Sequence, residues 1–458
     1  MAKMKAPSGF RDFLPDACRK RGELMRRIRA VYERFGYEPI ETPAMENLAV
    51  FLGKGGGENE KLMFKLLNRG EKLARALEGG IKDENDLADM GLRFDLTVPL
   101  ARFFAEHRAN LPSPFKRFHI GPVWRAERAQ HGRFREFVQC DVDVLGSASL
   151  MVEADVLLAT ATALNELGFS DLEVRLNSRK LLTALVLGAG VAPDLAPTAI
   201  TALDKLEKIG VEGVRTELTE RAVSAEAAAR LLDAFAAART LAGEALLAEI
   251  KKRLVTDWKA LDAQAAAALT AEIRQVLALT PQLPAGKLVF DPFLARGLDY
   301  YTGPIFEIAA AGVPFSLAGG GRYDEMVGAF CGQPVPACGF SIGFERIYTL
   351  MEERGMFGAA QRAADVLVAA TAPEAERAAI ETAQLFRSAL LRADCFPGQA
   401  KLPRIFELAE KKAIPVVALV GPAELASGTV GLRELATRQT HPVPRAEAAA
   451  KLKSLLGS

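Results

Sequence analysis

The sequence predicts an α+β protein in which a helical segment interrupts the first domain and a smaller α/β domain follows. Three observations support this fold class: strands and loops alternate over residues 92–146, alanine-rich helical sequence fills residues 178–285, and strands alternate with helices after about residue 362. A chain of 458 residues is long enough for about three domains. We expect a first domain in two parts (1–177 and 286–357), a helical insertion (178–285) and a C-terminal domain (363–458).

The first elements of the chain are predicted to be a helix and, farther on, an antiparallel hairpin. Residues 17–35 carry Leu24, Ile28, Val31 and Phe35 at the spacing of an amphipathic helix. The segments HIGPVWRAE and REFVQCDVDVLG flank the polar stretch RAQHGR. This pattern is typical of two antiparallel strands that are joined by a long basic loop.

Alternation along the second strand of this hairpin separates apolar from polar side chains. Three valines and a cysteine fall on one face, whereas Gln139, Asp141 and Asp143 fall on the other. We expect the polar face to be exposed to water. On the first strand, Arg125 and Glu127 are expected to share a face.

The rest of the chain continues this alternation of helical and strand-like segments. Residues 178–285 include AEAAARLLDAFAAART and LDAQAAAALTAEI, which favour helices. Strand and turn signals return in KLVFDPFLARGLDYY, GGGRYDEMVG and GFSIGFERIYTLMEERG. Near the C-terminus, ADVLVAA and IPVVALVG are strand-like and enclose two helical segments, which indicates a small α/β unit with its own core.

Composition excludes several classes of protein. The 58 basic and 57 acidic residues give a net charge of +1, so a polyanionic partner would have to bind to a local basic patch. The five cysteines are scattered and odd in number, which indicates a reducing compartment, and neither they nor the four histidines have the spacing of a zinc site. No run of sequence approaches the roughly 18–20 apolar residues of a membrane span. We therefore expect a cytoplasmic protein without a membrane contact.

Three arginines lie beside glycine or aromatic residues in segments that are otherwise apolar, and they are Arg125, Arg296 and Arg346. Each could simply pair with a neighbouring acid, and these acids are Glu127, Asp299 and Glu345. Together the arginines favour an anion site, because the planar guanidinium group matches the oxygens of phosphate and carboxylate. Such a site suits phosphoryl or nucleotidyl transfer, in which fixed cations stabilise developing charge; recognition of a carboxylate alone is the alternative.

The acids, amide and phenols of these segments also have more than one interpretation. Asp95, in the triplet DLT, could cap a helix that begins before VPLARFF, and Gln139 and Asp143 could be solvated. If they converge near the cations, they would suit a small zwitterion whose side chain carries hydrogen-bonding nitrogen. Because successive residues of a strand face opposite ways, Tyr300 and Tyr301 should not both enter such a site unless the strand is bulged or begins near residue 303.

Four segments together resemble the histidyl-tRNA synthetases, which are class II aminoacyl-tRNA synthetases. They are VWRAERAQHGRFREFVQCDVDVLG, LARGLDYYTGPIFE, AGGGRYDEMVG and GFSIGFERI. The resemblance extends from SGFRDFLP near the N-terminus to the C-terminal α/β unit, and RGLDYY and GGRYD are its most specific motifs. It implies a class II catalytic domain, with an antiparallel sheet flanked by helices, and a C-terminal anticodon-binding domain.

The resemblance implies a role for each candidate residue. The catalytic residues at the α-phosphate of ATP would be Arg125 and Arg296. The residues that bind ATP would be Arg125, Glu127, Arg133 and Arg346, with Mg²⁺ carried on the ATP phosphates and contacted at most by Glu127. Histidine would be bound by Asp95 and Thr97 at its amino group, Gln139 at its polar backbone groups, and Asp143 and Tyr301 at its imidazole. The residues at the tRNA end would be Arg133 and Arg135.

The partners that the resemblance implies are L-histidine, tRNA(His) and a second copy of the chain. ATP would activate the histidine carboxylate as histidyl-adenylate, and the terminal ribose of the tRNA would then accept the histidyl group. Residues 17–45 resemble the dimer-forming element of class II enzymes, so a homodimer is expected.

Two alternatives use the same fold. A histidine-sensing protein of the type of the ATP phosphoribosyltransferase regulatory subunit would bind histidine without aminoacylation, but such paralogues typically lack the C-terminal domain and catalytic arginines. This chain keeps Arg125, Arg296, Arg346 and a C-terminal unit. A class II synthetase for another amino acid is the second alternative, and Asp143 with Tyr301 argues against it because that pair suits an imidazole.

Overall fold

The computed structural model describes residues 4–52, 62–81, 83–128, 134–280, 282–284, 286–295, 300–313, 315–357 and 362–457. The chain forms two compact units, one made of most of residues 1–356 and the other of residues 357–458 with residues 14–20. The five cysteines, all within the described ranges, are free. No helix of the described ranges is long and apolar enough to cross a membrane.

The larger unit is built on a sheet whose eight described strands run in the order β1-β5-β6-β11-β10-β9-β7-β8. Neighbouring strands are antiparallel except at the two edges, where β1 is parallel to β5 and β8 is parallel to β7. This confirms the predicted α+β class and shows that the sheet is mixed at its edges. The bounds are β1 Glu38–Pro39, β5 Phe115–Trp124, β6 Glu136–Leu145, β7 Leu172–Ser178, β8 Gly286–Phe290, β9 Pro304–Ala310, β10 Ala318–Arg322 and β11 Ala337–Gly343.

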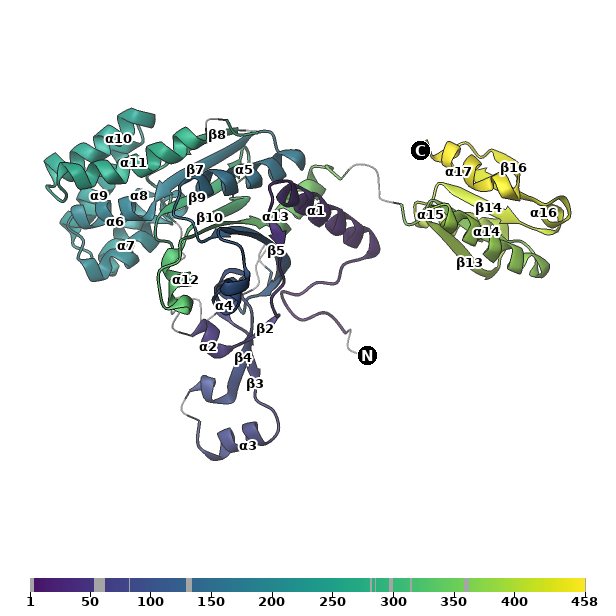
Figure 1. Cartoon of the computed structure of the whole chain (residues 1–458), viewed down its shortest axis with the longest axis horizontal. Coiled ribbons are helices and arrows are strands. Elements are labelled where there is room, and N and C mark those ends of the chain that lie inside the picture. Colours follow the sequence, from purple (N-terminus) through teal and green to yellow (C-terminus); the bar gives the residue numbers. More distant parts are fainter. Residues whose placement is uncertain are drawn as a thin grey trace. The chain divides into compact units, whose positions relative to one another are not determined.

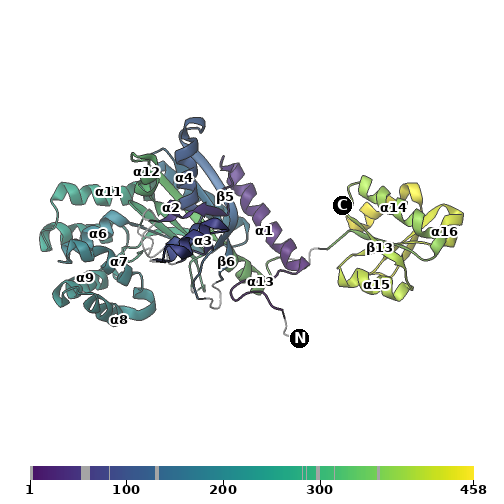
Figure 2. The same cartoon turned by 90° about the horizontal axis from the view of Figure 1, so that it is seen from below.

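Helices cover both faces of this sheet. On one face lie α1 (Pro15–Arg34) and α5 (Met151–Glu166): the Tyr32 and Phe118 rings are 5.9 Å apart, and α5 contacts β6, β10 and β11 (Figures 1 and 2). On the other lie α4 (Thr97–His107) and α12 (Asp324–Cys331), with Phe104 stacked on Phe115. The apolar side chains of β6 point toward α1 and α5. Its polar side chains therefore project from the opposite face of the sheet, the face that carries α4 and α12.

The predicted helix over residues 17–35 corresponds to α1, in which Leu24, Ile28 and Val31 are buried as their spacing indicates. The helix ends at Arg34, so Phe35 lies just beyond it and is only partly buried. Tyr32 is the last buried residue of the helix. The glycine at position 36 has φ +75°, a conformation that favours glycine and stops the helix.

The helices of the alanine-rich segment come between β7 and β8 in the sequence, and they gather at one end of the sheet (Figure 1). Alanine and leucine are strong helix formers, and Ser224 and Asp262 cap two of these helices by accepting hydrogen bonds from the backbone at Ala227 and Ala265. The helices are α6 Arg179–Gly188, α7 Ala196–Leu203, α8 Leu206–Glu220, α9 Ala225–Ala238, α10 Gly243–Lys252 and α11 Ala263–Leu279. Limits of 178 and 285 for an insertion domain stay a prediction.

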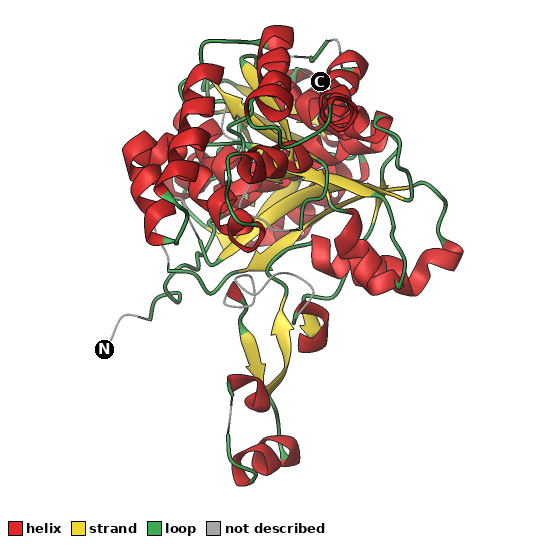
Figure 3. Ribbon diagram, turned by 90° about the vertical axis from the view of Figure 1, so that its left-hand side faces the viewer, coloured by secondary structure: helices red, strands yellow, loops and turns green. Residues whose placement is uncertain are grey.

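A small antiparallel sheet in the order β2-β4-β3 extends away from the large sheet together with α3 (Figures 1 and 3). Its elements are β2 Met45–Asn47, β3 Lys65–Leu67, α3 Glu71–Glu78 and β4 Ala88–Leu92, and the short helix α2 (Leu48–Phe51) joins it to the core. Leu48 and Phe51 are buried against Met63 and Phe94, which fixes the segment before α4.

The C-terminal unit has a five-stranded sheet in the order β13-β12-β14-β15-β16 among its described residues. Alternate residues of β12 enter two separate cores: Val366, Val368 and Ala370 pack with α14 and α17, whereas Leu367 and Ala369 pack with α15. Figure 2 shows α14 and α15 on opposite sides of the sheet. The bounds are β12 Val366–Ala370, α14 Glu376–Ser388, β13 Ala393–Gln399, α15 Leu402–Lys411, β14 Val416–Val420, α16 Pro422–Ser427, β15 Thr429–Glu434, β16 Thr440–Pro444 and α17 Ala448–Leu456.

Candidate functional site

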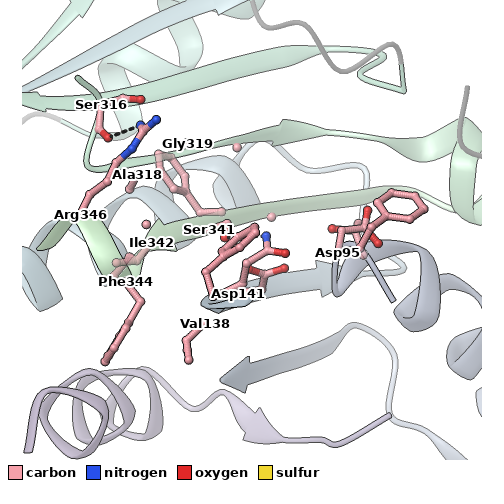
Figure 4. Close-up of a pocket in the computed structure, with 18 of the residues that line it drawn as sticks. Asp95, Val138, Asp141, Ser316, Ala318, Gly319, Ser341, Ile342, Phe344 and Arg346 are labelled. Atoms are coloured by element: carbon pink, nitrogen blue, oxygen red, sulfur yellow. Dashed lines mark hydrogen bonds between the residues drawn. The ribbon is translucent and has the colours of Figure 1, made fainter. Parts of the chain in front are cut away.

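A pocket of about 360 Å³ lies on the face of the large sheet that carries the polar side of β6 (Figure 4). Its floor is formed by β6, β10 and β11, and its ends by the segments before α4, after β5 and at the start of α13 (Phe344–Glu353). Eight of the candidate residues line it, and they are Asp95, Thr97, Arg125, Glu127, Gln139, Asp143, Tyr301 and Arg346. Residues from six segments of the chain therefore meet at one surface.

Two arginines line this pocket from different elements. Arg125 follows the last residue of β5, donates a hydrogen bond from Nε to the carbonyl oxygen of Phe94 at 3.0 Å, and lies 5.1 Å from the centre of the Phe137 ring. Arg346 lies in the first turn of α13 and donates from Nη1 to the carbonyl oxygen of Ser316 at 3.0 Å. The strand ends at Trp124, so the expectation that Arg125 and Glu127 share a strand face is wrong, although both line the pocket.

The ends of the pocket differ in charge. Figure 4 places Arg346 at one end and Asp95 at the other, with Ser341 between them. Asp141 and Asp143 lie on β6 in the floor of the pocket. One end of the pocket therefore carries the cation Arg346, and the other carries the carboxylate of Asp95 together with Arg125, whose charge acts on that carboxylate.

Asp95 both caps a helix and lines the pocket. Its Oδ1 accepts a hydrogen bond from the backbone N–H of Val98 at 3.2 Å, so the capping interpretation of DLT holds together with the functional one. Burial raises the pKa of Asp95 from 3.8 to about 6, against the opposing effects of the Val98 hydrogen bond and the positive charge of Arg125. A carboxyl group with such a pKa is partly ionised at neutral pH and costs free energy to bury.

Asp143 is not exposed to water, contrary to the expectation for the polar face of its strand. Only 3% of the residue is exposed, and Oδ2 lies 2.7 Å from Nη2 of Arg117 on the neighbouring strand. The hydroxyl group of Tyr323 donates a hydrogen bond to Oδ1. Burial raises the pKa of Asp143, and Arg117 and Tyr323 oppose the rise. The solvated interpretation is wrong because β5 and the residue after β10 supply partners that cover the carboxylate.

Tyr300 and Tyr301 both line the pocket, and their ring centres lie 4.8 Å apart. Strand β9 begins only at Pro304, so the two tyrosines are not on a strand and the alternation of strand residues does not separate them. Tyr300 therefore does not face elsewhere, and the exception named for this case, a strand that begins near residue 303, is the one that the structure shows.

The remaining candidates lie elsewhere or outside the described residues. Arg135 donates from Nε to the carbonyl oxygen of Glu127 at 2.9 Å and from Nη1 to that of Ser8 at 3.5 Å, so its side chain joins the segment after β5 to the N-terminal segment. Arg133 and Arg296 fall outside the residues that the structure describes. Roles for all three stay predictions.

Three polar residues of the site had no assigned role in the sequence interpretation. Asp141 and Tyr323 line the pocket, and Arg117 contacts Asp143 from the neighbouring strand. Asp141 was visible as a member of the polar face of β6, and Tyr323 as part of GGGRYD. Arg117 had a signal too, because pairing Trp124 with Glu136 at the loop end of the predicted hairpin brings Arg117 opposite Asp143.

The described residues contain no group of three or more His, Cys, Asp or Glu side chains that could hold a metal ion. Glu127 is a single carboxylate at the same side of the pocket as Arg125. A hard cation such as Mg²⁺ is commonly bound by one or two carboxylates together with substrate phosphates, so these residues fit a metal that arrives with a nucleotide.

Comparison with known proteins identifies the family. The sequence model of the family described as Histidyl-tRNA synthetase matches residues 9–347, and that of an Anticodon binding domain matches residues 365–455. A relative from Leifsonia xyli, named histidine–tRNA ligase, is 47% identical over 352 residues, which cover 76% of this chain and 80% of the relative. A relative of the same name from Christiangramia forsetii is 37% identical, covering 92% of this chain and 93% of its own.

Solved structures agree with these matches. The crystal structure of histidyl-tRNA synthetase from Nostoc sp. superposes with a TM-score of 0.78 at 29% identity, covering 99% of this chain and 100% of the other. An ATP phosphoribosyltransferase regulatory subunit/histidyl-tRNA synthetase from Bacillus halodurans shares the fold, with a TM-score of 0.71 at 20% identity, and covers 92% of this chain. The resemblance inferred from the motifs is thus confirmed: the chain belongs to the histidyl-tRNA synthetase family.

Proposed function

We propose that this protein ligates L-histidine to tRNA(His) through a histidyl-adenylate intermediate, with ATP and Mg²⁺ as the activating pair. The observation that carries the proposal is one pocket in which eight candidate residues meet, among them the cations Arg125 and Arg346, which would bind phosphate, and the carboxylates Asp95 and Asp143, which would bind the amino acid. Family membership and the histidine–tRNA ligases among the relatives support it.

The activation step needs positive charge where the reacting phosphate oxygens lie. A carboxylate oxygen of histidine attacks the α-phosphorus of ATP, the new O–P bond forms, and the bond to the β-phosphate breaks to release pyrophosphate. Arg125 is fixed by Phe94 and Arg346 by Ser316, so neither guanidinium group has to reorganise as charge develops. Arg296 and Arg133 would add further positive charge beside the phosphates. Mg²⁺ on the ATP phosphates would be contacted at most by Glu127.

The amino-acid end supplies acceptors for a zwitterion with two ring nitrogens. Asp95 and Thr97, before and at the first turn of α4, would accept the ammonium group, and Gln139 would contact the polar backbone groups. Asp143 and Tyr301 would meet the imidazole. An apolar side chain in this place leaves buried polar groups unpaired at about 1–3 kcal/mol each, which gives selectivity for histidine without a separate editing step.

In the second step, the 3′-terminal ribose hydroxyl of the tRNA attacks the activated carbonyl carbon and AMP leaves. Arg133 and Arg135 are proposed near this end of the tRNA. In the C-terminal unit, Lys401, Arg404 and Lys411 are exposed at and along α15, where a phosphate backbone can reach them. A cytoplasmic homodimer is the expected form of the enzyme.

Pyrophosphate exchange into ATP, measured with each of the twenty amino acids, tests the proposal. Exchange that depends on histidine alone and stops when Mg²⁺ is chelated is the expected result. Histidine binding without exchange would indicate instead a histidine sensor, and exchange with another amino acid would indicate a different synthetase. The sensor is the less favoured alternative, because relatives named histidine–tRNA ligase align over most of the chain and the C-terminal unit is present.

A further inference from the structure

Arg117 is a fully buried cation beside the candidate site, on the same face of the sheet as Asp143. Its exposed fraction is 0%, and it is among the largest side chains that are completely enclosed. It lies in the middle of β5, directly opposite Asp143 on β6, and Nη2 is 2.7 Å from Oδ2 of that carboxylate. Among the described residues, none of the three guanidinium nitrogens of Arg117 has a hydrogen-bond partner, so its contact with Asp143 is an ion pair.

A pair of this kind is poorly explained as a device for stability. Removing two charges from water costs several kcal/mol each, and a buried ion pair is often no more stable than apolar side chains of the same volume. The cost is higher still when part of a guanidinium group remains unpaired. The contact that Arg117 does make is with a carboxylate that lines the pocket, which points to a functional reason for the pair.

The residues around Asp143 fix the orientation of its carboxylate and also influence its ionisation. Arg117 contacts Oδ2 and the Tyr323 hydroxyl donates to Oδ1, so the plane of the carboxylate is held from two sides. Opposite Asp143 on β11 stands Gly339, where a Cβ atom would lie 1.8 Å from Oδ1. An ionised carboxylate has about four lone-pair positions, so acceptor capacity remains for a donor in the pocket.

Arg117 is the cation that sets the charge of this carboxylate. The other titratable groups around Asp143 are His119 on β5, Asp141 on β6, Asp95 before α4, Tyr323 after β10, Cys338 on β11, and Tyr32 and Tyr37 in and after α1. Burial lowers the pKa of His119 to about 3 and raises the pKa values of the phenols and the thiol, so these groups are neutral at pH 7. The two other acids are anions when ionised and would favour protonation of Asp143.

We propose that Arg117 is a positioning residue that holds Asp143, from the neighbouring strand, as an oriented anionic acceptor for an N–H donor on the side chain of the substrate. Arg117 is not among the described residues that line the pocket, so it acts through Asp143 and not by touching the ligand. This inference rests on the proposed function for the identity of the donor, which is the imidazole of histidine. Without Arg117, the pKa of Asp143 would rise further, and a protonated carboxyl group is a weaker acceptor.

The test is Arg117→Met, which keeps an unbranched apolar chain, with Arg117→Lys as the conservative variant that keeps the charge. Histidine-dependent pyrophosphate exchange and calorimetric histidine binding are measured from pH 6.5 to 9. Each value is divided by that of the unsubstituted protein at the same pH, so that the effect of protonating the free histidine cancels. For Arg117→Met we expect KM and Kd for histidine to rise about tenfold to a hundredfold at pH 7. This is the effect of losing the charged hydrogen bond between Asp143 and the substrate. KM for ATP should change by less than about threefold.

The pH dependence separates positioning from a merely structural role. The loss in Arg117→Met should shrink as the pH rises, because Asp143 then ionises without its cation, and Arg117→Lys should recover most of the binding at pH 7. Arg175→Met is the control, because Arg175 lies on β7 of the same sheet and pairs with Glu173 outside the pocket. It should leave histidine binding unchanged.

Two results would overturn the inference: an unchanged Kd in Arg117→Met, or a loss that is constant with pH and equal for histidine and ATP. If Arg117→Met does not fold, Arg117→Gln, which keeps a hydrogen-bond donor without the charge, must show the same pH-dependent loss or the inference fails. Calorimetry measures histidine binding without catalysis. An unsubstituted protein that binds histidine but shows no pyrophosphate exchange would contradict the proposed function. The comparison of binding between variants would still decide the role of Arg117.

Discussion

Arg21 on α1 donates two hydrogen bonds to Glu345 at the start of α13, from Nη1 to Oε2 at 2.7 Å and from Nη2 to Oε1 at 2.8 Å. Arg11 donates to the same carboxylate at 2.5 Å, and the backbone N–H of Val138 donates to Oε1 at 3.3 Å. Glu345 precedes Arg346, and Val138 precedes Gln139. One buried carboxylate therefore joins the N-terminal segment, α1 and β6 at the point where two candidate ligand-binding residues enter the pocket.

Replacing Arg21 by Met should destabilise the larger unit by about 3 kcal/mol, since removing one member of a buried ion pair leaves an uncompensated charge. Only 7% of the Glu345 side chain is exposed; burial works against its charge, yet Arg21 and Arg11 hold its pKa below the ordinary value. Urea unfolding at pH 7 measures the change. The matched control is Arg26→Met, whose exposed pair with Glu23 on the same helix should contribute little to stability because solvent screens it. Equal effects of the two substitutions would contradict this role of Glu345.

Adding one methyl group at Gly339 should damage both stability and histidine binding. A Cβ atom there would lie 1.8 Å from Oδ1 of Asp143 and 3.0 Å from the carbonyl oxygen of Val142, so the strands or the carboxylate must move. We expect Gly339→Ala to cost about 1–3 kcal/mol in the free energy of unfolding and to weaken calorimetric binding of histidine. Gly22→Ala is the control: nothing lies within 4 Å of its Cβ position, and alanine in a helix should be neutral or stabilising. Normal histidine binding by Gly339→Ala would be evidence against this close approach.

The stability of the larger unit should depend on the ionisation of Asp141. Burial raises the pKa of this carboxyl group from 3.8 to about 7, chiefly by desolvation, and Oδ1 has no hydrogen-bond partner among the described residues. Because the folded-state pKa lies above the unfolded-state value, the contribution to stability is present below about pH 4 and is lost as the pH rises to about 7. Asp141→Asn should therefore be more stable than the unsubstituted protein at pH 8, by up to about 4 kcal/mol, and equal to it near pH 4.

Urea unfolding across that pH range measures the difference for Asp141. The substitution Asp171→Asn at an exposed position serves as the control and should produce no difference that varies with pH. A constant effect of Asp141→Asn from pH 4 to pH 8 would show that the folded protein does not retain the proton.

Arg125→Lys should reduce kcat of pyrophosphate exchange by about 10²–10³-fold while KM for histidine changes little, the pattern of a group that acts on the transition state. Lysine keeps the charge, but it has no Nε to donate to Phe94 and no planar fork to match phosphate oxygens. Arg102→Lys is the control, because Arg102 pairs with Glu46 and Glu106 outside the pocket and should leave exchange unchanged. A rise in KM for histidine with an unchanged kcat would remove Arg125 from the chemistry.

The sequence reached the fold class because its signals are local. Alternation in REFVQCDVDVLG, the spacing of Leu24, Ile28 and Val31, and the alanine-rich helices each depend on neighbours in the chain, and the structure bears them out. The motifs also indicated the family, which the comparisons confirm. Errors arose where an element ended: β5 stops at Trp124 and β9 starts at Pro304, and element boundaries depend on packing against the rest of the molecule.

By itself, the sequence determined the alternation of β6, the hairpin with its basic loop, and the set of arginines and acids from which a histidine- and nucleotide-binding site could be assembled. Tertiary structure alone decided the environment of those groups. Asp143 is buried against Arg117 and Tyr323 because strands β5 and β6 pair in one register and Tyr323, which follows β10, reaches the carboxylate across β11. Glu345 joins three segments that lie far apart in the chain. A charge state depends on burial and on neighbouring charges, and both are properties of the folded chain.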